Sequence, residues 1–230
     1  MKILVTRPFV DGREIATRLA ELGHQALLAP LLEPRFFDGP EPALDDVQAI
    51  LATSANGVRA LIRRTARRDI PIFAVGPQTA EEATKAGFAE VRSADGDAVA
   101  LAEAAARWAR PEGVLLHVCG EDAPGRLADT LAHRGFPVRR VVLYGMVPAG
   151  ELPPEVRTAL DEGHLDAVMF FSPRSARLFL SLARGLPIAG LTAFCISPAT
   201  ADVLASGIFA EVRIADRPNQ AAMLSLADRA

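Results

Sequence analysis

Six short polar turns carry most of the residues that could bind a ligand. Each turn follows a run of apolar or β-branched residues and precedes a segment of helical character. They span residues 6–8, 53–57, 76–79, 120–125, 172–175 and 197–200. Free N–H groups at a helix start, together with Ser and Thr hydroxyls, bind anionic groups. Six such turns indicate a ligand with many anionic groups, although helix capping alone explains any single turn.

Several of these turns have a strong helix-start signal. Gly76-Pro77, Ser172-Pro173 and Ser197-Pro198 each place an N-cap residue before a proline at the first helical position. Three arginines, Arg7, Arg59 and Arg174, lie at or near the turns. Their planar guanidinium groups suit carboxylate or phosphate, but a surface arginine is usually only a solvated charge.

Tyr144 is the only tyrosine in the chain, and it lies in an extended stretch that ends in Pro148. A phenol there could donate a proton or a hydrogen bond. It could equally be a half-buried aromatic side chain of a strand. The residues alone leave both interpretations open and favour the second.

Motifs for bound nucleotides and metals are missing from the sequence. Residues 120–127 have the glycine spacing of a P-loop but lack its Lys and Ser/Thr. The sequence contains neither G-x-G-x-x-G nor the G-x-S-x-G of a nucleophile elbow. The histidines do not have metal-ligand spacing; they are His24, His117, His133 and His164. We therefore expect no metal and no bound cofactor.

The turns require strands before them and helices after them. The predicted strands are residues 3–5, 49–53, 72–75, 114–118, 167–171 and 193–196. In the first helix, Ile15, Leu19 and Leu22 share one face, and Gly23 ends it. Asp11 and Glu14 have the spacing of a capping box at its start. Strands that alternate with helices predict an α/β fold with parallel sheets covered on both faces.

The chain also repeats itself. Residues 3–37 align with 115–149, and residues 47–60 align with 165–178. Further along, FAVGPQTAEEATKAGFAEV aligns with FCISPATADVLASGIFAEV. The order A–B–A′–B′ predicts two similar small domains. The chain divides between them either once, near Arg110-Pro111, or twice, at the extended stretches near 31–38 and 141–150.

Composition restricts the class of protein. Of 230 residues, 50% are hydrophobic and 23% charged, and the net charge is −3. This balance predicts a folded domain and gives no general attraction to nucleic acid or anionic membranes. Cys119 and Cys195 lie in apolar runs and suit a reducing, cytoplasmic compartment. No stretch is long and apolar enough for a signal peptide or a membrane span.

The whole chain resembles the uroporphyrinogen-III synthase family. The segments that carry the resemblance are ILVTRP, LGHQALLAPLLEP (22–34), TSANGVRAL (53–61), FAVGPQTAEEATKAGF (73–88), VLYGMVP (142–148), LDAVMFFSPRSA (165–176) and CISPATA (195–201). Their combination and order, more than any single motif, identify the family.

The resemblance implies two α/β domains, joined by a two-stranded β linker, with the active site in the cleft between them. Residues 1–34 and 150–230 would form one domain and 38–144 the other, with linkers near 35–37 and 145–149. The resemblance implies an enzyme that needs no metal and no cofactor, and we expect a monomer.

The implied reaction closes hydroxymethylbilane, a linear tetrapyrrole with eight carboxylates, to uroporphyrinogen III. Water is lost, and ring D is inverted through a spirocyclic intermediate. By position, Tyr144 is the implied proton donor or orienting group. The expected substrate-binding residues are Arg7, Ser54, Gly76, Thr79, Ser172, Arg174, Ser175, Ser197 and Thr200. The alternative is a non-catalytic, two-lobed α/β protein that binds a small polyanion and needs no Tyr144.

Overall fold

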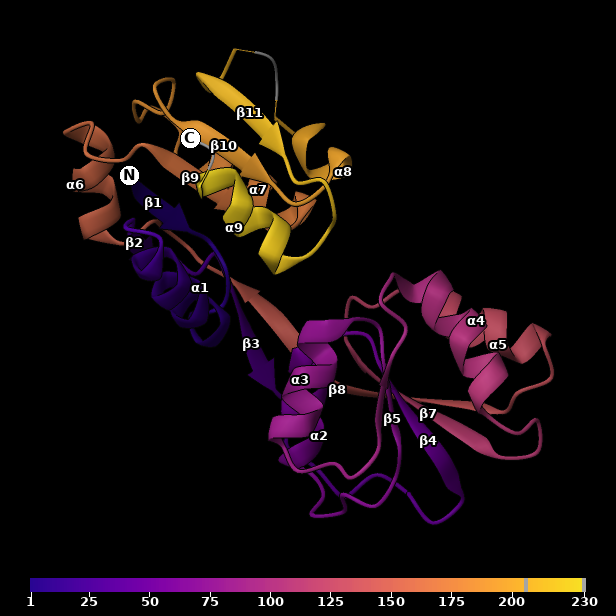
Figure 1. Cartoon of the computed structure of the whole chain (residues 1–230). Coiled ribbons are helices and arrows are strands. Elements are labelled where there is room, and N and C mark those ends of the chain that lie inside the picture. The colour runs from indigo at the N-terminus through magenta and orange to yellow at the C-terminus, as the bar shows by residue number, and fades with distance from the viewer. Residues whose placement is uncertain (205–206, 229–230) are drawn as a thin grey trace. The chain divides into compact units, whose positions relative to one another are not determined.

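The computed structural model describes residues 1–204 and 207–228. The chain divides into two compact units (Figure 1). The first unit combines Met1–Glu33 with Val147–Ala230, and the second is Pro34–Met146. The chain therefore crosses between the units twice, and Arg110-Pro111 lies within the second unit.

The first unit contains a five-stranded parallel sheet within the described residues, in the order β11-β10-β9-β1-β2. Its strands are β1 (Lys2–Val5), β2 (Gln25–Leu28), β9 (Ala167–Phe170), β10 (Thr192–Cys195) and β11 (Glu211–Ile214). Its helices are α1 (Phe9–Glu21), α6 (Pro154–Asp161), α7 (Pro173–Leu182), α8 (Pro198–Ala201) and α9 (Gln220–Asp228).

The second unit contains a six-stranded sheet in the order β3-β8-β7-β4-β5-β6. Its strands are β3 (Leu32–Phe36), β4 (Val47–Ala52), β5 (Ile72–Ala74), β6 (Val91–Ser93), β7 (Val114–Gly120) and β8 (Val138–Pro148). Its helices are α2 (Ala55–Ile62), α3 (Pro77–Lys85), α4 (Ala98–Trp108) and α5 (Arg126–His133).

The two units follow one plan. The order β11-β10-β9-β1-β2 corresponds strand by strand to β6-β5-β4-β7-β8. These pairs are the ones that the sequence repeat aligns, although residues 205 and 206 of the last repeat lie outside the described residues. The glycines that follow α1 and α5, Gly23 and Gly135, both adopt positive φ. The predicted α/β duplication is confirmed.

Strands β3 and β8 form the predicted two-stranded linker. The Phe37 N–H donates to the Leu143 carbonyl, and the Ala149 N–H donates to the Leu31 carbonyl. Residue numbers rise on one strand as they fall on the other, so the pairing is antiparallel. The remaining pairs described in both sheets are parallel.

Each sheet separates two apolar clusters, because side chains alternate along its strands. On β1, Ile3 and Val5 pack with α1 and α9, while Leu4 packs on the side of α6 and α7. On β7, Leu115 faces α4 and α5, whereas Leu116 faces α2. Both faces of each sheet are therefore covered, which leaves the strand ends as the accessible edges.

The start of α1 differs from the sequence prediction. Pro8 occupies the N-cap position, and no side chain caps the helix there. Asp11 instead pairs with Arg7, and Glu14 accepts a hydrogen bond from Gln220. The predicted capping box is therefore wrong. Leu22, expected on the buried face, is the C-cap residue and is 40% exposed.

His117 is a buried histidine on β7, on the side that faces α4 and α5. Within the described residues, neither of its ring nitrogens has a hydrogen-bond partner. Burial, helped by the positive charge of Arg140, lowers the pKa of His117 to about 4. The imidazole is therefore neutral in the folded protein at physiological pH.

Protonation of His117 should destabilise the protein in mild acid. The unfolded chain binds the proton near pH 6.5, but the folded chain does not until about pH 4. The contribution of His117 to the free energy of unfolding is therefore complete above pH 6.5. It decreases as the pH falls from 6.5 toward 4, and the free energy of unfolding drops by about 2 kcal/mol between pH 7.5 and pH 5. Urea unfolding at both pH values should show this loss in the wild type and a smaller loss in His117→Leu. Equal losses would contradict the assignment.

Candidate functional site

All six turns singled out from the sequence lie at carboxyl ends of parallel strands. In the first unit, residues 197–200, 172–175 and 6–8 follow the neighbouring strands β10, β9 and β1. In the second unit, residues 76–79, 53–57 and 120–125 follow β5, β4 and β7. Ligands of open parallel sheets bind at this edge.

In the first unit, the serines and Thr200 make local hydrogen bonds within their own turns. Ser172 is the N-cap of α7, and its Oγ accepts the Ser175 N–H at 3.1 Å. The Ser175 hydroxyl donates to the Ser172 carbonyl at 2.9 Å. Ser197 Oγ lies 3.1 Å from Oγ1 of the buried Thr200. These contacts order the turns, whereas Arg174 is exposed.

Arg7 has a structural partner that the sequence analysis did not include. Its Nη2 lies 2.7 Å from Oδ2 of Asp11, whose side chain is only 3% exposed. The guanidinium also lies 4.9 Å from the centre of the Phe171 ring. The i,i+4 spacing of opposite charges was the sequence signal for this pair. The same guanidinium therefore links the end of β1 to α1 and to the residue after β9.

In the second unit, Ser54 caps α2 and begins a polar network. Its Oγ accepts the Asn56 N–H at 3.1 Å. The Asn56 side-chain oxygen accepts from Arg59 at 3.1 Å, and Arg59 pairs with Glu82 of α3 at 2.7 Å. Sequence reasoning missed this network because its members come from two helices whose contact no local spacing shows.

Gly76 and Thr79 lie at the start of α3, next to that network. Gly76 is the N-cap residue, and Pro77 occupies the first turn as predicted. Thr79 is buried. In the sequence repeat Thr79 corresponds to Thr200, so both units bury a threonine at the same point of the same turn.

Tyr144 lies on β8 of the second unit and is 8% exposed. Burial raises the pKa of its phenol, while a hydrogen bond with the Ser54 side chain opposes that rise. A Cβ atom on Gly120 would lie 2.9 Å from Cε2 and Cζ of the ring. The structure therefore brings Tyr144, Ser54 and Gly120 together.

Both cysteines lie in apolar runs of the sequence. Both are free and buried, as predicted. Burial raises the pKa of the Cys195 thiol to about 12, so it is not a nucleophile at neutral pH. Among residues 1–204 and 207–228, no group of three or more His, Cys, Asp and Glu side chains could hold a metal ion. No helix in these ranges is long and apolar enough to cross a membrane.

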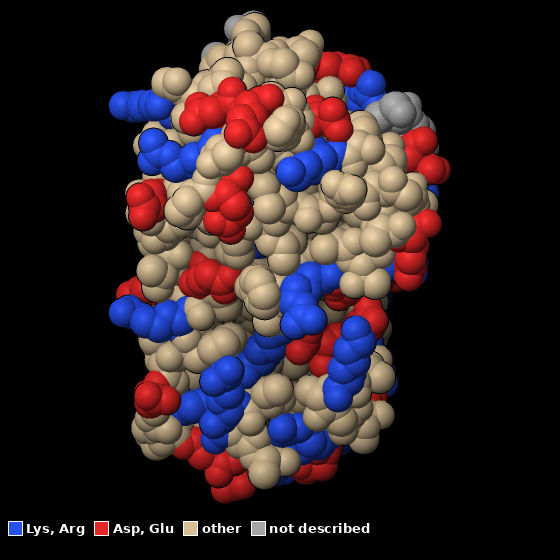
Figure 2. All heavy atoms as spheres, turned by 90° about the vertical axis from the view of Figure 1, so that its left-hand side faces the viewer, with Lys and Arg blue, Asp and Glu red and all other residues tan. Residues whose placement is uncertain are grey.

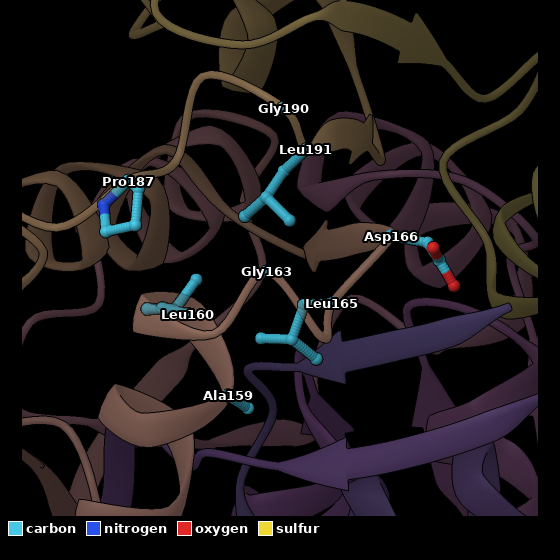
Figure 3. A pocket seen from close by; sticks show the side chains of 8 residues that line it. All are labelled: Ala159, Leu160, Gly163, Leu165, Asp166, Pro187, Gly190 and Leu191. Atoms are coloured by element: carbon cyan, nitrogen blue, oxygen red, sulfur yellow. The ribbon is translucent and has the colours of Figure 1, made fainter.

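A pocket of about 280 Å³ lies at the opposite end of the first sheet. Asp166 and Leu191, which line it, directly precede β9 and β10. Figure 3 shows Leu160, Leu165 and Leu191 converging around Gly163. Because this pocket lies at the amino ends of the strands, it is not part of the candidate site.

Surface charge does not single out another site on the visible face. Figure 2 shows basic and acidic side chains next to one another on this face. Elsewhere in the described residues, exposed charges form pairs, such as Arg67 with Asp69 and Arg139 with Asp46. Exposed pairs of this kind contribute little to stability.

Comparison with known proteins decides the family. The sequence model for uroporphyrinogen-III synthase HemD matches residues 13–225. The chain belongs to this family. A porphyrin biosynthesis protein HemD of Ruminiclostridium josui is 26% identical over 219 residues. That match covers 87% of this chain but only 43% of the relative, so the chain spans less than half of that protein's length.

Solved structures of this family have the same fold. Uroporphyrinogen-III synthetase of Helicobacter pylori superimposes with a TM-score of 0.69 at 20% identity, covering 98% of this chain and 97% of that one. A mutant uroporphyrinogen III synthase of Thermus thermophilus gives 0.54 at 21% identity, covering 100% and 98%.

Breaking the Arg7–Asp11 pair should cost stability. Arg7→Ala leaves the buried Asp11 carboxylate without this partner, and we expect a loss of about 3 kcal/mol in the free energy of unfolding. Adding Asp11→Asn should restore part of it, because the buried charge is then removed. Arg18→Ala is the control, since its pair with Glu21 on the same helix is exposed. Equal effects of Arg7→Ala and Arg18→Ala in urea unfolding would argue against this account.

Proposed function

We propose that this protein is a uroporphyrinogen-III synthase, a lyase of porphyrin biosynthesis. It converts hydroxymethylbilane to uroporphyrinogen III with loss of water and inversion of ring D. The observation that carries the proposal is the family match over residues 13–225. We further propose that it acts as a monomer in the cytoplasm; the two free thiols support a reducing compartment.

The carboxyl-end edges of the two sheets would bind the carboxylates of the substrate. Helices α2, α3 and α7 begin at these edges, and helix N-termini favour negative charge. The residues proposed to bind substrate are Arg7, Ser54, Gly76, Thr79, Ser172, Arg174, Ser175, Ser197 and Thr200. Because backbone groups do much of this binding, the site needs few specific side chains.

Tyr144 is the proposed proton donor. The reaction begins when the substrate hydroxyl leaves as water, which produces an electrophilic methylene group on ring A. An ordinary phenol is already protonated at neutral pH, and burial raises the pKa of Tyr144 further, so its O–H is present to donate to the departing oxygen.

The rest of the reaction depends on geometry. Ring D attacks through its substituted α-carbon and forms the spirocyclic intermediate, which then fragments and closes in the opposite orientation. Without the enzyme, the bilane closes through the free α-position of ring D and gives the type I isomer. The enzyme must therefore hold rings A and D in the less accessible arrangement, and proximity and orientation account for most of the catalysis.

A product-isomer assay tests the function and the role of Tyr144 together. Freshly made hydroxymethylbilane is incubated with the wild type, with Tyr144→Phe or without protein, and the oxidised porphyrins are separated. The wild type should give type III and the blank type I. Tyr144→Phe should give type III at a rate lowered by about ten- to a hundredfold, since a phenol is a weak acid.

Two results would contradict these assignments. An unchanged rate in Tyr144→Phe would remove its proposed role. Only type I product from folded wild-type protein would exclude the synthase and favour a two-lobed binding protein for a polyanion.

Ser172 offers a test of carboxylate binding that keeps the fold intact. Asp and Asn cap helices as well as Ser does, so Ser172→Asp and Ser172→Asn should unfold at wild-type urea concentrations. The added carboxylate should repel those of the substrate and raise KM about five- to tenfold, whereas the neutral Asn should not. Equal KM values for the two variants would exclude a substrate carboxylate at this turn.

A further inference from the structure

The ring of Tyr144 lies on an unexpected side of its strand. Leu143 and Tyr144 are consecutive residues, yet both are buried in the cluster formed with α2 and α3. In a regular strand, consecutive side chains point to opposite faces. Tyr144 would then share the side of Val142, which is 43% exposed.

An irregularity in the pairing of β7 and β8 explains this placement. Cys119 pairs with Val142, but the next residue, Gly120, pairs with Tyr144, so Leu143 is the extra residue on β8. Bulges are rare between parallel strands, and they redirect the side chains that follow them. This one turns Tyr144 toward α2.

Gly120 provides the space for the redirected ring. A Cβ atom there would lie 2.9 Å from Cε2 and Cζ of Tyr144 and 3.2 Å from its oxygen. The ring therefore lies against a bare Cα, and any other residue would displace it.

Ser54 meets the phenol group at the same end of the ring. Its Oγ accepts the Asn56 N–H, and its side chain also shares a hydrogen bond with the Tyr144 phenol. A hydroxyl whose oxygen accepts from the backbone has its own hydrogen available to donate. If Ser54 donates to the phenol oxygen, the phenol hydrogen is left for another acceptor.

We propose that Gly120 and Ser54 are positioning residues for Tyr144: Gly120 sets the plane of the ring, and Ser54 orients the phenol so that its O–H can be donated to substrate. The catalytic consequence rests on the proposed synthase function. The placement of the phenol does not.

The phenol itself reports its position, because Tyr144 is the only tyrosine of the chain. Tyrosinate absorbance followed during alkaline titration therefore measures this one group. Ser54→Gly removes the hydroxyl while keeping a tolerated N-cap residue, and it should raise the pKa of Tyr144 further, since the favourable hydrogen bond is lost. Ser54→Thr should restore the wild-type titration.

Gly120→Ala should act in the opposite direction. The added methyl displaces the ring, exposes the phenol and should move its pKa back toward its ordinary value. Gly150→Ala is the control, because a Cβ there meets nothing within 4 Å. If Ser54→Gly and Gly120→Ala both titrate like the wild type, the proposal is overturned.

Activity provides a second, independent readout. Ser54→Gly should lower kcat about tenfold, the effect of one hydrogen bond, and Ser54→Thr should recover it. In a Tyr144→Phe background, Ser54→Gly should lower kcat no further, because it acts through the phenol. If the loss of kcat in the double variant equals the product of the losses in the two single variants, the positioning role is overturned. If the titrations shift as expected but the wild type makes no type III product, the synthase assignment falls and the placement of the phenol stands.

Discussion

Parallel pairing of two central strands in each sheet is the constraint on which the rest of the structure depends. β1 pairs with β9 in the first unit, and β4 pairs with β7 in the second. Because parallel strands end at the same edge, three polar turns of each unit come together there, although they are far apart in the sequence. Helices cover both faces of each sheet, so these edges are where a ligand can approach the ends of the strands.

The two units share the residues proposed to bind substrate, but only the second unit contains the residue proposed for catalysis. Thr79 and Thr200 occupy the same point of the repeated turn, so the groups proposed to bind carboxylates occur in both units. Tyr144 has no such counterpart, because the repeat aligns it with Leu32, a buried side chain. This pattern suits a substrate that carries many similar carboxylates but only one leaving hydroxyl.

Much of this architecture could be predicted from sequence, because it depends on local patterns and on the repeat. Alternating apolar runs, Gly23 and the Ser-Pro starts identified the elements, and the repeat indicated two similar domains. The spacing of Arg7 and Asp11 was compatible with an ion pair, but the sequence prediction assigned Asp11 to a capping box with Glu14. The redirection of Tyr144 could not be predicted. One extra residue on β8 leaves no periodic signal, and its effect depends on Gly120, which lies on another strand, 24 positions before Tyr144.

Hydrogen exchange with and without uroporphyrinogen III, kept reduced, tests most directly whether the strand carboxyl ends bind the tetrapyrrole. The account predicts slower exchange of backbone N–H groups in residues 54–57, 76–79, 172–175 and 197–200. Residues 159–166 and 187–191, at the amino-end pocket, should exchange as before. Protection confined to that pocket, with unchanged exchange at the four turns, would contradict it.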